Sequence, residues 1–97
     1  MMHKIKYTDL AKKDLHNLKK TGQNKKLAKI KKTIDKLAAN PRHPGLHTHK
    51  NNSVENPFDV ESFQSYVENK TPGAFRIFWC YGPDKSEITI FAVTPHP

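Results

Sequence analysis

Arg76 lies within the most apolar run of the chain, residues 74–81 (AFRIFWCY). Of the 17 basic residues, only Arg42 and Arg76 are arginines, and the others are lysines. A planar guanidinium in a strand-like apolar run indicates a specific anionic partner. Two kinds of partner fit equally well: a carboxylate on a neighbouring strand, either Glu61 or Glu68, or a phosphate group on a bound molecule.

Two histidines, His47 and His49, flank Thr48, and in an extended chain their imidazoles point to the same side. Histidine titrates near neutral pH, so such a pair can donate or accept protons. Together with His43 or His96 the pair could also bind zinc. No cysteine joins the group and its spacing is not that of a known zinc site, so we expect neither a metal nor a cofactor.

The charge of the chain is unevenly distributed. Residues 1–50 contain 14 basic residues against three acidic ones, whereas residues 51–97 contain three basic residues against six acidic ones. A basic half of this kind attracts polyanions such as nucleic acids, or an acidic protein partner. A solvated lysine surface that keeps the protein soluble explains the same charges equally well.

The length of 97 residues fits one small domain, residues 1–97, with a single core. The hydrophobic content of 35% suffices for one sheet covered by helices on one face. One cysteine cannot form an internal disulfide, and there is no apolar run typical of a signal peptide or a membrane span. We therefore expect a cytoplasmic protein without membrane contacts.

Two amphipathic helices follow a short first strand at residues 3–7. Thr8 is a suitable cap for the first helix, and Asp9 suits its positive end. The second helix should end at Asn40, because Pro41 disfavours helical geometry in the residue before it. The apolar stripes that predict these helices are Ala11, Leu15 and Leu18 in the first, and Leu27, Ile30, Ile34 and Leu37 in the second.

The C-terminal half is typical of β structure. Residues 41–57 predict a loop, because they are rich in proline, glycine and asparagine. Strands are predicted at residues 58–67, 74–81 and 87–94, separated by turns at residues 70–73 and 82–85. The resulting order is β-α-α-β-β-β, an α+β fold in which a helix hairpin packs on one face of an antiparallel sheet.

Alternation along the central strand, residues 74–81, divides it into two faces. The more apolar set should receive the helices, and it consists of Phe75, Ile77, Trp79 and Tyr81. Arg76, Phe78 and Cys80 then lie on the opposite, open face. Cys80 and Trp79 are best explained as core residues, although Trp79 and Phe78 could also stack on nucleic-acid bases.

This pattern resembles the RelE/ParE superfamily of bacterial toxins over essentially the whole chain. The resemblance rests on the element order, the basic helix hairpin, the segment Asn40-Pro41-Arg42-His43-Pro44-Gly45-Leu46 and the strand Phe75-Arg76-Ile77-Phe78-Trp79. It implies a cognate antitoxin as partner. It also implies one of two activities: RelE-like members, including HigB and YoeB, cleave mRNA on the ribosome, whereas ParE-like members bind DNA gyrase.

The resemblance further implies roles for individual residues. RNA cleavage by its own 2′-hydroxyl needs a base, a cation for the phosphorane and an acid for the leaving oxygen. Arg76 matches the superfamily's strand arginine, and His96 falls where YoeB-like nucleases place a C-terminal histidine, which would be the acid. The candidate base is Glu61, or else His47 or His49. Candidate RNA-binding residues are Lys50, His47 and His49 and the helix lysines Lys25, Lys29 and Lys32.

The chain also departs from the superfamily pattern. RelE-type enzymes carry paired lysines on the strand before the arginine, where this chain has Glu61, Gln64, Ser65 and Tyr66. They commonly end in a catalytic tyrosine, and here the terminus is Pro97. These departures leave a histidine and carboxylate mechanism closer to that of YoeB, or loss of nuclease activity. We expect a ribosome-dependent mRNA endonuclease; the alternatives are a gyrase inhibitor and a member that only binds a partner protein.

Overall fold

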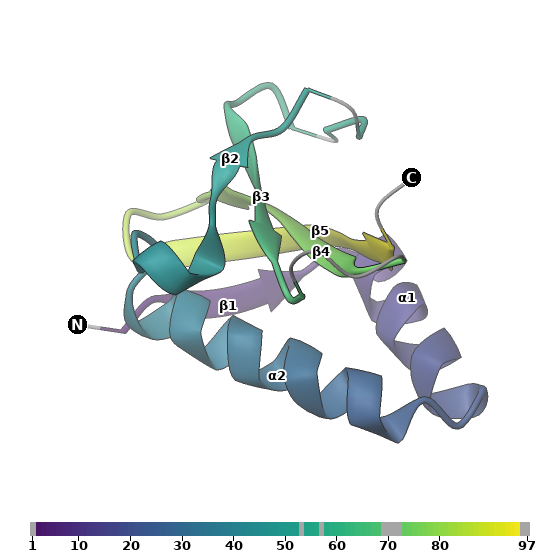
Figure 1. Cartoon of the computed structure of the whole chain (residues 1–97). Helices are drawn as coiled ribbons and strands as arrows, with labels where there is room; N and C mark the ends of the chain where they lie inside the picture. The colour runs from purple at the N-terminus through teal and green to yellow at the C-terminus, as the bar shows by residue number, and fades with distance from the viewer. Residues whose placement is uncertain (1, 53, 57, 69–72, 96–97) are drawn as a thin grey trace.

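Within residues 2–52, 54–56, 58–68 and 73–95, which the computed structural model describes, five strands form one mixed sheet and two helices pack on one face of it (Figure 1). The sheet order is β1-β5-β4-β3-β2. The elements are β1 (Lys4–Tyr7), α1 (Asp9–Lys20), α2 (Asn24–Ala39), the 3-10 turn η1 (Pro44–Leu46), β2 (His49–Lys50), β3 (Ser62–Tyr66), β4 (Phe75–Tyr81) and β5 (Glu87–Pro95). The predicted α+β class and the central place of the strand that carries Arg76 are confirmed.

One edge of the sheet differs from the predicted antiparallel arrangement. β1 runs parallel to β5, with Ile5 opposite Ile88, whereas β3, β4 and β5 pair in antiparallel fashion. Alternation of apolar residues assigns the two faces of a strand but carries no information about the direction of its neighbour. The helix hairpin brings the chain back beside the start of β1, where the backbone N–H of His3 donates to the carbonyl of Ala38 (2.7 Å).

The start of α1 and the end of α2 lie where the sequence predicts them. Thr8 caps α1, because its Oγ1 accepts a hydrogen bond from the backbone N–H of Ala11 (3.2 Å). Asp9 lies in the first turn of α1, where a negative charge is favourable. α2 ends at Ala39, and Asn40 is already extended (φ −156°), as expected for a residue that precedes proline.

The main core lies between the helices and the sheet, as the alternation of β4 predicts. It contains Ile77 and Trp79 of β4, which are 0% and 1% exposed. The other buried members are Ala11, Leu18, Ile30, Ile34, Leu37, Leu46, Ile88, Ile90 and Val93. A register shift between Phe78 and Trp79 interrupts the β4–β5 ladder. Near it, the carboxylate of Asp14 in α1 accepts a hydrogen bond from the backbone N–H of Val93 (3.0 Å), which fixes α1 to β5.

The segment between α2 and β3 is more ordered than the predicted loop at residues 41–57, and the strand predicted at residues 58–67 begins only at Ser62. The segment contains η1 and β2, and β2 pairs with β3 through His49 opposite Gln64. Side-chain amides hold the turns that follow. The Asn51 Oδ1 accepts from the backbone N–H of Val54 (3.0 Å), and its Nδ2 donates to Ser62 Oγ (3.1 Å). Such side-chain bonds compete with strand pairing, which explains the later start of β3.

The turn predicted at residues 70–73 falls largely on residues 69–72, which lie outside the described residues. Only Gly73 is described there, and its positive φ of 70° suits glycine. The second predicted turn does separate β4 from β5.

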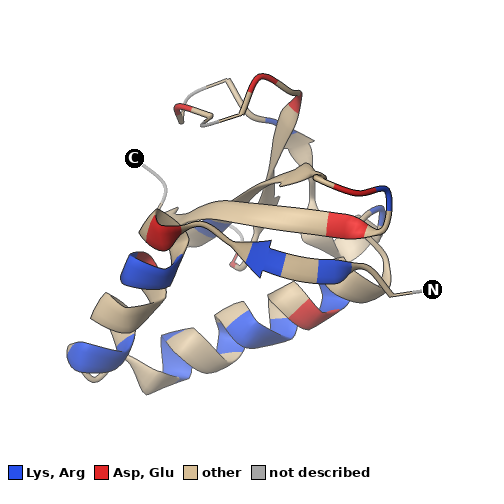
Figure 2. Ribbon diagram, turned by 180° about the vertical axis from the view of Figure 1, so that it is seen from behind, with Lys and Arg blue, Asp and Glu red and all other residues tan. Residues whose placement is uncertain are grey.

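Basic side chains occupy the outer surface of the helix layer. Figure 2 shows lysines along α1, α2 and β1. Among the described residues, Leu10 is the one large hydrophobic residue of α1 and α2 that is exposed, at 58%. In the same described part of the chain, no helix is long and apolar enough to span a membrane.

Candidate functional site

Arg76 lies on the open face of the sheet, opposite Tyr66 in β3 and Thr94 in β5. Its Nη1 donates a hydrogen bond to Gln64 Oε1 (2.6 Å), and its guanidinium carbon lies 4.1 Å from the centroid of the Tyr66 ring. The Nε atom is buried and has no hydrogen-bond partner among the described residues. The guanidinium is therefore held in place by two neutral side chains, Gln64 and Tyr66.

The carboxylate partners considered for Arg76 are engaged elsewhere. Glu68 forms ion pairs with Lys26 and Lys29 of α2, and Glu61 pairs with Lys50 (3.3 Å). Among the described residues, no salt bridge is formed by Arg76. The hypothesis of an internal ion pair is therefore wrong for Glu61 and Glu68, and the positive charge of Arg76 stays available for an external anion.

Two imidazoles lie beside the same tyrosine. The ring centroids of His47 and His49 are 5.8 and 5.6 Å from that of Tyr66. His47 adopts a left-handed conformation (φ 47°) at the end of η1, which turns the chain into β2. β2 then pairs with β3 and places His49 opposite Gln64, the residue that binds Arg76. The structure thus brings together a guanidinium and two exposed imidazoles around one aromatic ring.

Sequence reasoning missed the importance of Tyr66 and Gln64. Both lie in the segment where RelE-type enzymes carry paired lysines, so in the sequence they stand out only as a departure from that pattern. Their separation of two residues shows that they share a face in a strand. Only the β3–β4 register, with Tyr66 opposite Arg76 and Gln64 opposite Phe78, shows that this face is the one that carries Arg76.

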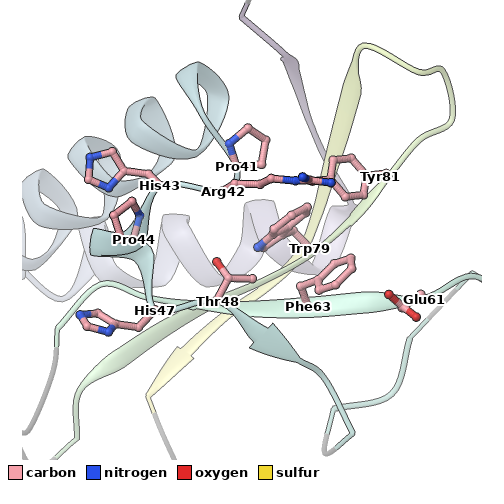
Figure 3. Close-up of a pocket in the computed structure, with 10 residues that line it drawn as sticks. All are labelled: Pro41, Arg42, His43, Pro44, His47, Thr48, Glu61, Phe63, Trp79 and Tyr81. Atoms are coloured by element: carbon pink, nitrogen blue, oxygen red, sulfur yellow. The ribbon is translucent and has the colours of Figure 1, made fainter.

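Glu61 and Lys50 lie away from this group. The separation of five residues between Glu61 and Tyr66 is odd, so their side chains point to opposite faces of an extended chain. Glu61 instead lines a pocket on the helix side of the sheet, together with Phe63, Trp79 and Tyr81 (Figure 3). Lys50 is opposite Phe63 in the β2–β3 ladder, on this same side.

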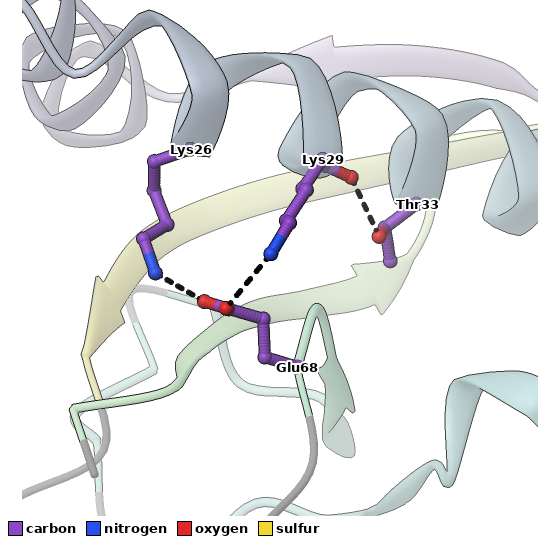
Figure 4. Close-up of polar contacts among 4 residues, drawn as sticks. All are labelled: Lys26, Lys29, Thr33 and Glu68. Atoms are coloured by element: carbon purple, nitrogen blue, oxygen red, sulfur yellow. Dashed lines mark hydrogen bonds and ion pairs between the residues drawn. The ribbon is translucent and has the colours of Figure 1, made fainter. Parts of the chain in front are cut away.

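The helix lysines proposed to bind RNA have different environments. Lys25 and Lys32 are exposed on α2. Lys29 and its neighbour Lys26 both contact Glu68, with a distance of 3.3 Å from Lys29 Nζ (Figure 4). The hydrogen bond from Lys26 is the main cause that lowers the pKa of the Glu68 carboxyl below its ordinary value, and the bond from Lys29 adds to it. Lys29 therefore helps to fasten α2 to the segment after β3.

The candidate acid, His96, lies outside the described residues, as does Pro97. The described part of β5 ends at Pro95, and Thr94 pairs with Arg76 in the β4–β5 ladder. The zinc hypothesis for the histidines gains no support, because the described residues contain no group of three histidine, cysteine, aspartate or glutamate side chains placed to hold a metal.

Comparisons with known proteins match the fold and not the sequence. No protein-family model matches the chain, and none of the curated proteins matches it significantly. Three solved structures share its fold. A YoeB/ParE toxin from Agrobacterium tumefaciens aligns with a TM-score of 0.72 at 12% identity, over 97% of this chain and 99% of that one. YoeB from Staphylococcus aureus, solved as a dimer, gives 0.71 at 15% identity over 100% of both chains.

An archaeal RelE, solved in complex with RelB from Pyrococcus horikoshii, gives a TM-score of 0.65 at 17% identity, over 98% of this chain and 96% of that one. Identities this low establish a common fold. The fold is therefore that of the RelE and YoeB/ParE toxins, and the fold expected from the RelE/ParE resemblance is confirmed.

Proposed function

We propose that this protein is the toxin of a toxin–antitoxin pair and that it cleaves mRNA on the ribosome. The observation that carries the proposal is the group on the open face: Arg76 lies over the Tyr66 ring without a salt bridge to any described residue, and His47 and His49 lie beside the same ring. The structures that share the fold are described as YoeB/ParE and RelE toxins, which supports the toxin role.

The chemistry that this group supports is cleavage of a phosphodiester by the neighbouring 2′-hydroxyl. The developing phosphorane dianion needs a fixed cation, and Arg76 provides one that neutral groups already orient. Preorganisation matters because a cation held in place needs no reorganisation when charge develops. Gln64 acts as a positioning residue, because it holds the guanidinium from the adjacent strand.

The base for the 2′-hydroxyl is His49 or His47. The ordinary pKa of histidine lies closer to neutrality than that of any other side chain, which suits proton transfer in both directions. Glu61, the carboxylate alternative, lies on the other side of the sheet and pairs with Lys50. We keep His96 as the acid, following its place in the sequence, since Thr94 two residues earlier lies beside Arg76.

The basic helix surface would dock the toxin on ribosomal RNA. Lys25 and Lys32 are exposed, and Lys29 remains 59% exposed although it contacts Glu68. Phosphate contacts by such lysines add affinity without base specificity. The antitoxin partner is inferred from the archaeal RelE, which was solved with RelB. The site of action would be the cytoplasm, where ribosomes translate mRNA.

The proposal is tested by inducing the chain in bacteria and mapping mRNA 5′ ends on ribosomes. We expect codon-phased cuts with the unmodified chain and none with Arg76→Ala. The double variant His47→Gln/His49→Gln should lose the cuts as well, while Lys85→Ala, on the turn before β5, should keep them. The same strains are assayed for gyrase supercoiling. Growth arrest with inhibited supercoiling and no cuts would show that the protein is a gyrase inhibitor instead. No toxicity at all would favour a member that only binds a partner protein.

A further inference from the structure

The pocket lined by Glu61, Phe63, Trp79 and Tyr81 lies on the opposite side of the sheet from Arg76. Its volume is about 570 Å³, within the range of roughly 300–1,000 Å³ that is usual for ligand sites. One wall is aromatic: the ring centroid of Trp79 lies 4.9 Å from that of Phe63 and 5.0 Å from that of Tyr81. Trp79 is buried beneath the other two, and Tyr81 is 42% exposed. The wall therefore offers accessible ring faces on which a planar ligand can stack.

Two side chains of opposite charge complete the pocket. Figure 3 shows Arg42 reaching from the segment after α2 towards Tyr81, and Glu61 beyond Phe63 at one end of the pocket. Arg42 is exposed, and its guanidinium forms no ion pair or hydrogen bond with the described residues. The Glu61 carboxylate contacts only Lys50 there, through Oε2, so its second oxygen is free to accept hydrogen bonds.

The pocket adjoins the open-face group through one residue. His47 lines the pocket, and its ring also lies 5.8 Å from that of Tyr66. Arg76 and Tyr81 lie on opposite faces of β4 and are separated along the strand by roughly 16 Å, at about 3.3 Å per residue. A single strand of RNA that passes His47 can therefore place one phosphate at Arg76 and a base a few nucleotides away at the aromatic wall. Splayed, single-stranded bases stacked on aromatic rings are the usual targets of sequence-specific RNA recognition.

We propose that this pocket binds a guanine base of the RNA a few nucleotides from the phosphate that is cut, an inference that rests on the proposed nuclease function. Stacking on Phe63 and Tyr81 accepts any base, so the polar groups must select one. A carboxylate only accepts hydrogen bonds and has about four lone-pair sites, so Glu61 can accept two bonds in parallel while its Oε2 keeps the contact with Lys50. Guanine is the one common base whose Watson–Crick edge presents two adjacent donors, the N1–H and the amino group. Arg42 would bind the phosphate of the same nucleotide.

The single tryptophan of the chain makes the pocket directly observable, because Trp79 is part of its wall. Fluorescence of the full-length protein is titrated with the four ribonucleoside 5′-monophosphates, with N-acetyltryptophanamide as a control for absorption by the nucleotide. We expect quenching by all four and a Kd for the guanine nucleotide about tenfold lower than the others, the discrimination of one good paired contact.

Two variants separate the contributions of the polar groups. Glu61→Gln should remove the tenfold preference, because an amide has only one acceptor oxygen. Arg42→Gln should weaken all four nucleotides alike. Their matched controls, Glu55→Gln and Lys85→Gln, make the same charge changes at exposed positions outside the pocket and should alter neither result.

Three results would overturn the inference: no quenching by any nucleotide, equal affinities for all four, or a preference that survives Glu61→Gln. Cut-site mapping separates this failure from failure of the nuclease proposal. With Glu61→Gln we expect cuts to continue while a guanine at a fixed distance of a few nucleotides from them loses its prevalence. If that guanine keeps its prevalence, or if the cuts vanish with Glu61→Gln, the pocket assignment fails while the nuclease stands. Guanine binding in a chain that never cuts would refute the nuclease and retain the pocket.

Discussion

On the helix side of the sheet, Ile77 and Trp79 are almost completely buried against the helices, whereas on the open face Arg76 is partly covered and forms no salt bridge with a described residue. Both sets come from the same strand. On the helix side each residue contributes by removing apolar area from water, which depends little on the identity of its neighbours. On the open face, Arg76 matters through directed contacts with Gln64 and Tyr66, which need one particular register. The first face should therefore govern stability and the second activity.

The largest effect on stability is expected from Trp79→Ala. Removing this buried ring should cost about 3–5 kcal/mol of the free energy of unfolding, from lost transfer energy and the cavity left behind. Urea unfolding measures the difference, with Arg76→Ala as the comparison from the open face, for which we expect a loss below about 1 kcal/mol. Equal losses for both variants would contradict the division of roles between the two faces.

The largest effect on activity is expected from Arg76→Ala. Loss of a preorganised group that stabilises the transition state typically lowers kcat by about 10²–10³. Arg76→Lys should recover only part of the rate, because an ammonium cannot both reach Gln64 and present a planar donor pair to phosphate. Single-turnover cleavage of ribosome-bound mRNA gives the rates. Full activity in either variant would remove Arg76 from the mechanism.

A smaller effect is expected where a polar contact lies within the helix-side core. Ser65 is fully buried, and its Oγ accepts a hydrogen bond from Trp79 Nε1 (2.8 Å) and contacts Thr48 Oγ1 (2.8 Å). Ser65→Ala leaves a buried indole N–H without a partner, which should cost about 1–3 kcal/mol of the free energy of unfolding. Urea unfolding measures this loss, and a shift in the emission maximum of Trp79 reports the missing hydrogen bond of its indole. Thr48→Val, which spares the indole bond, is the control and should cost less.

The smallest effect concerns pH. A hydrogen bond from Lys26 lowers the pKa of Glu68, and one from Lys6 lowers the pKa of Glu87. A carboxyl whose pKa is lower in the folded state stabilises the fold above its unfolded value, and this stability is lost as pH falls through the folded value. The urea midpoint should therefore decline below about pH 4.3, the ordinary glutamate value. Glu68→Gln should flatten that decline, whereas the exposed Glu55→Gln should leave it unchanged.

Much of the fold could be predicted because its signals are local. The helix stripes, the Thr8 cap and the proline after Asn40 fixed both helices, and alternation assigned Trp79 to the helix side. The direction of β1 and the existence of β2 could not be predicted in this way. β2 has only two residues, and it exists because it pairs with β3 rather than through any pattern of its own.

The candidate site likewise has one part that local patterns predict and another that depends on strand pairing. Arg76 could be placed on the open face from strand alternation alone, because the period of two is a property of the chain itself. Its neighbours could not be identified, since Tyr66, His49 and Glu61 lie at distant positions in the sequence and only the pairing of strands brings them near or keeps them apart. The sequence favoured Glu61 as the base, with His47 or His49 as alternatives, and the register places His49 on the face of Gln64 and Arg76.

By itself, then, the sequence determined the elements, their buried faces and the anomaly of one arginine in an apolar strand. These follow from backbone geometry and from the preference of apolar side chains to leave water, which act over a few residues. The tertiary structure decided which groups surround that arginine: Tyr66 and two imidazoles on the open face, with Glu61 and Arg42 beside a separate aromatic pocket. Those neighbours depend on strand register, a long-range choice that no local pattern encodes.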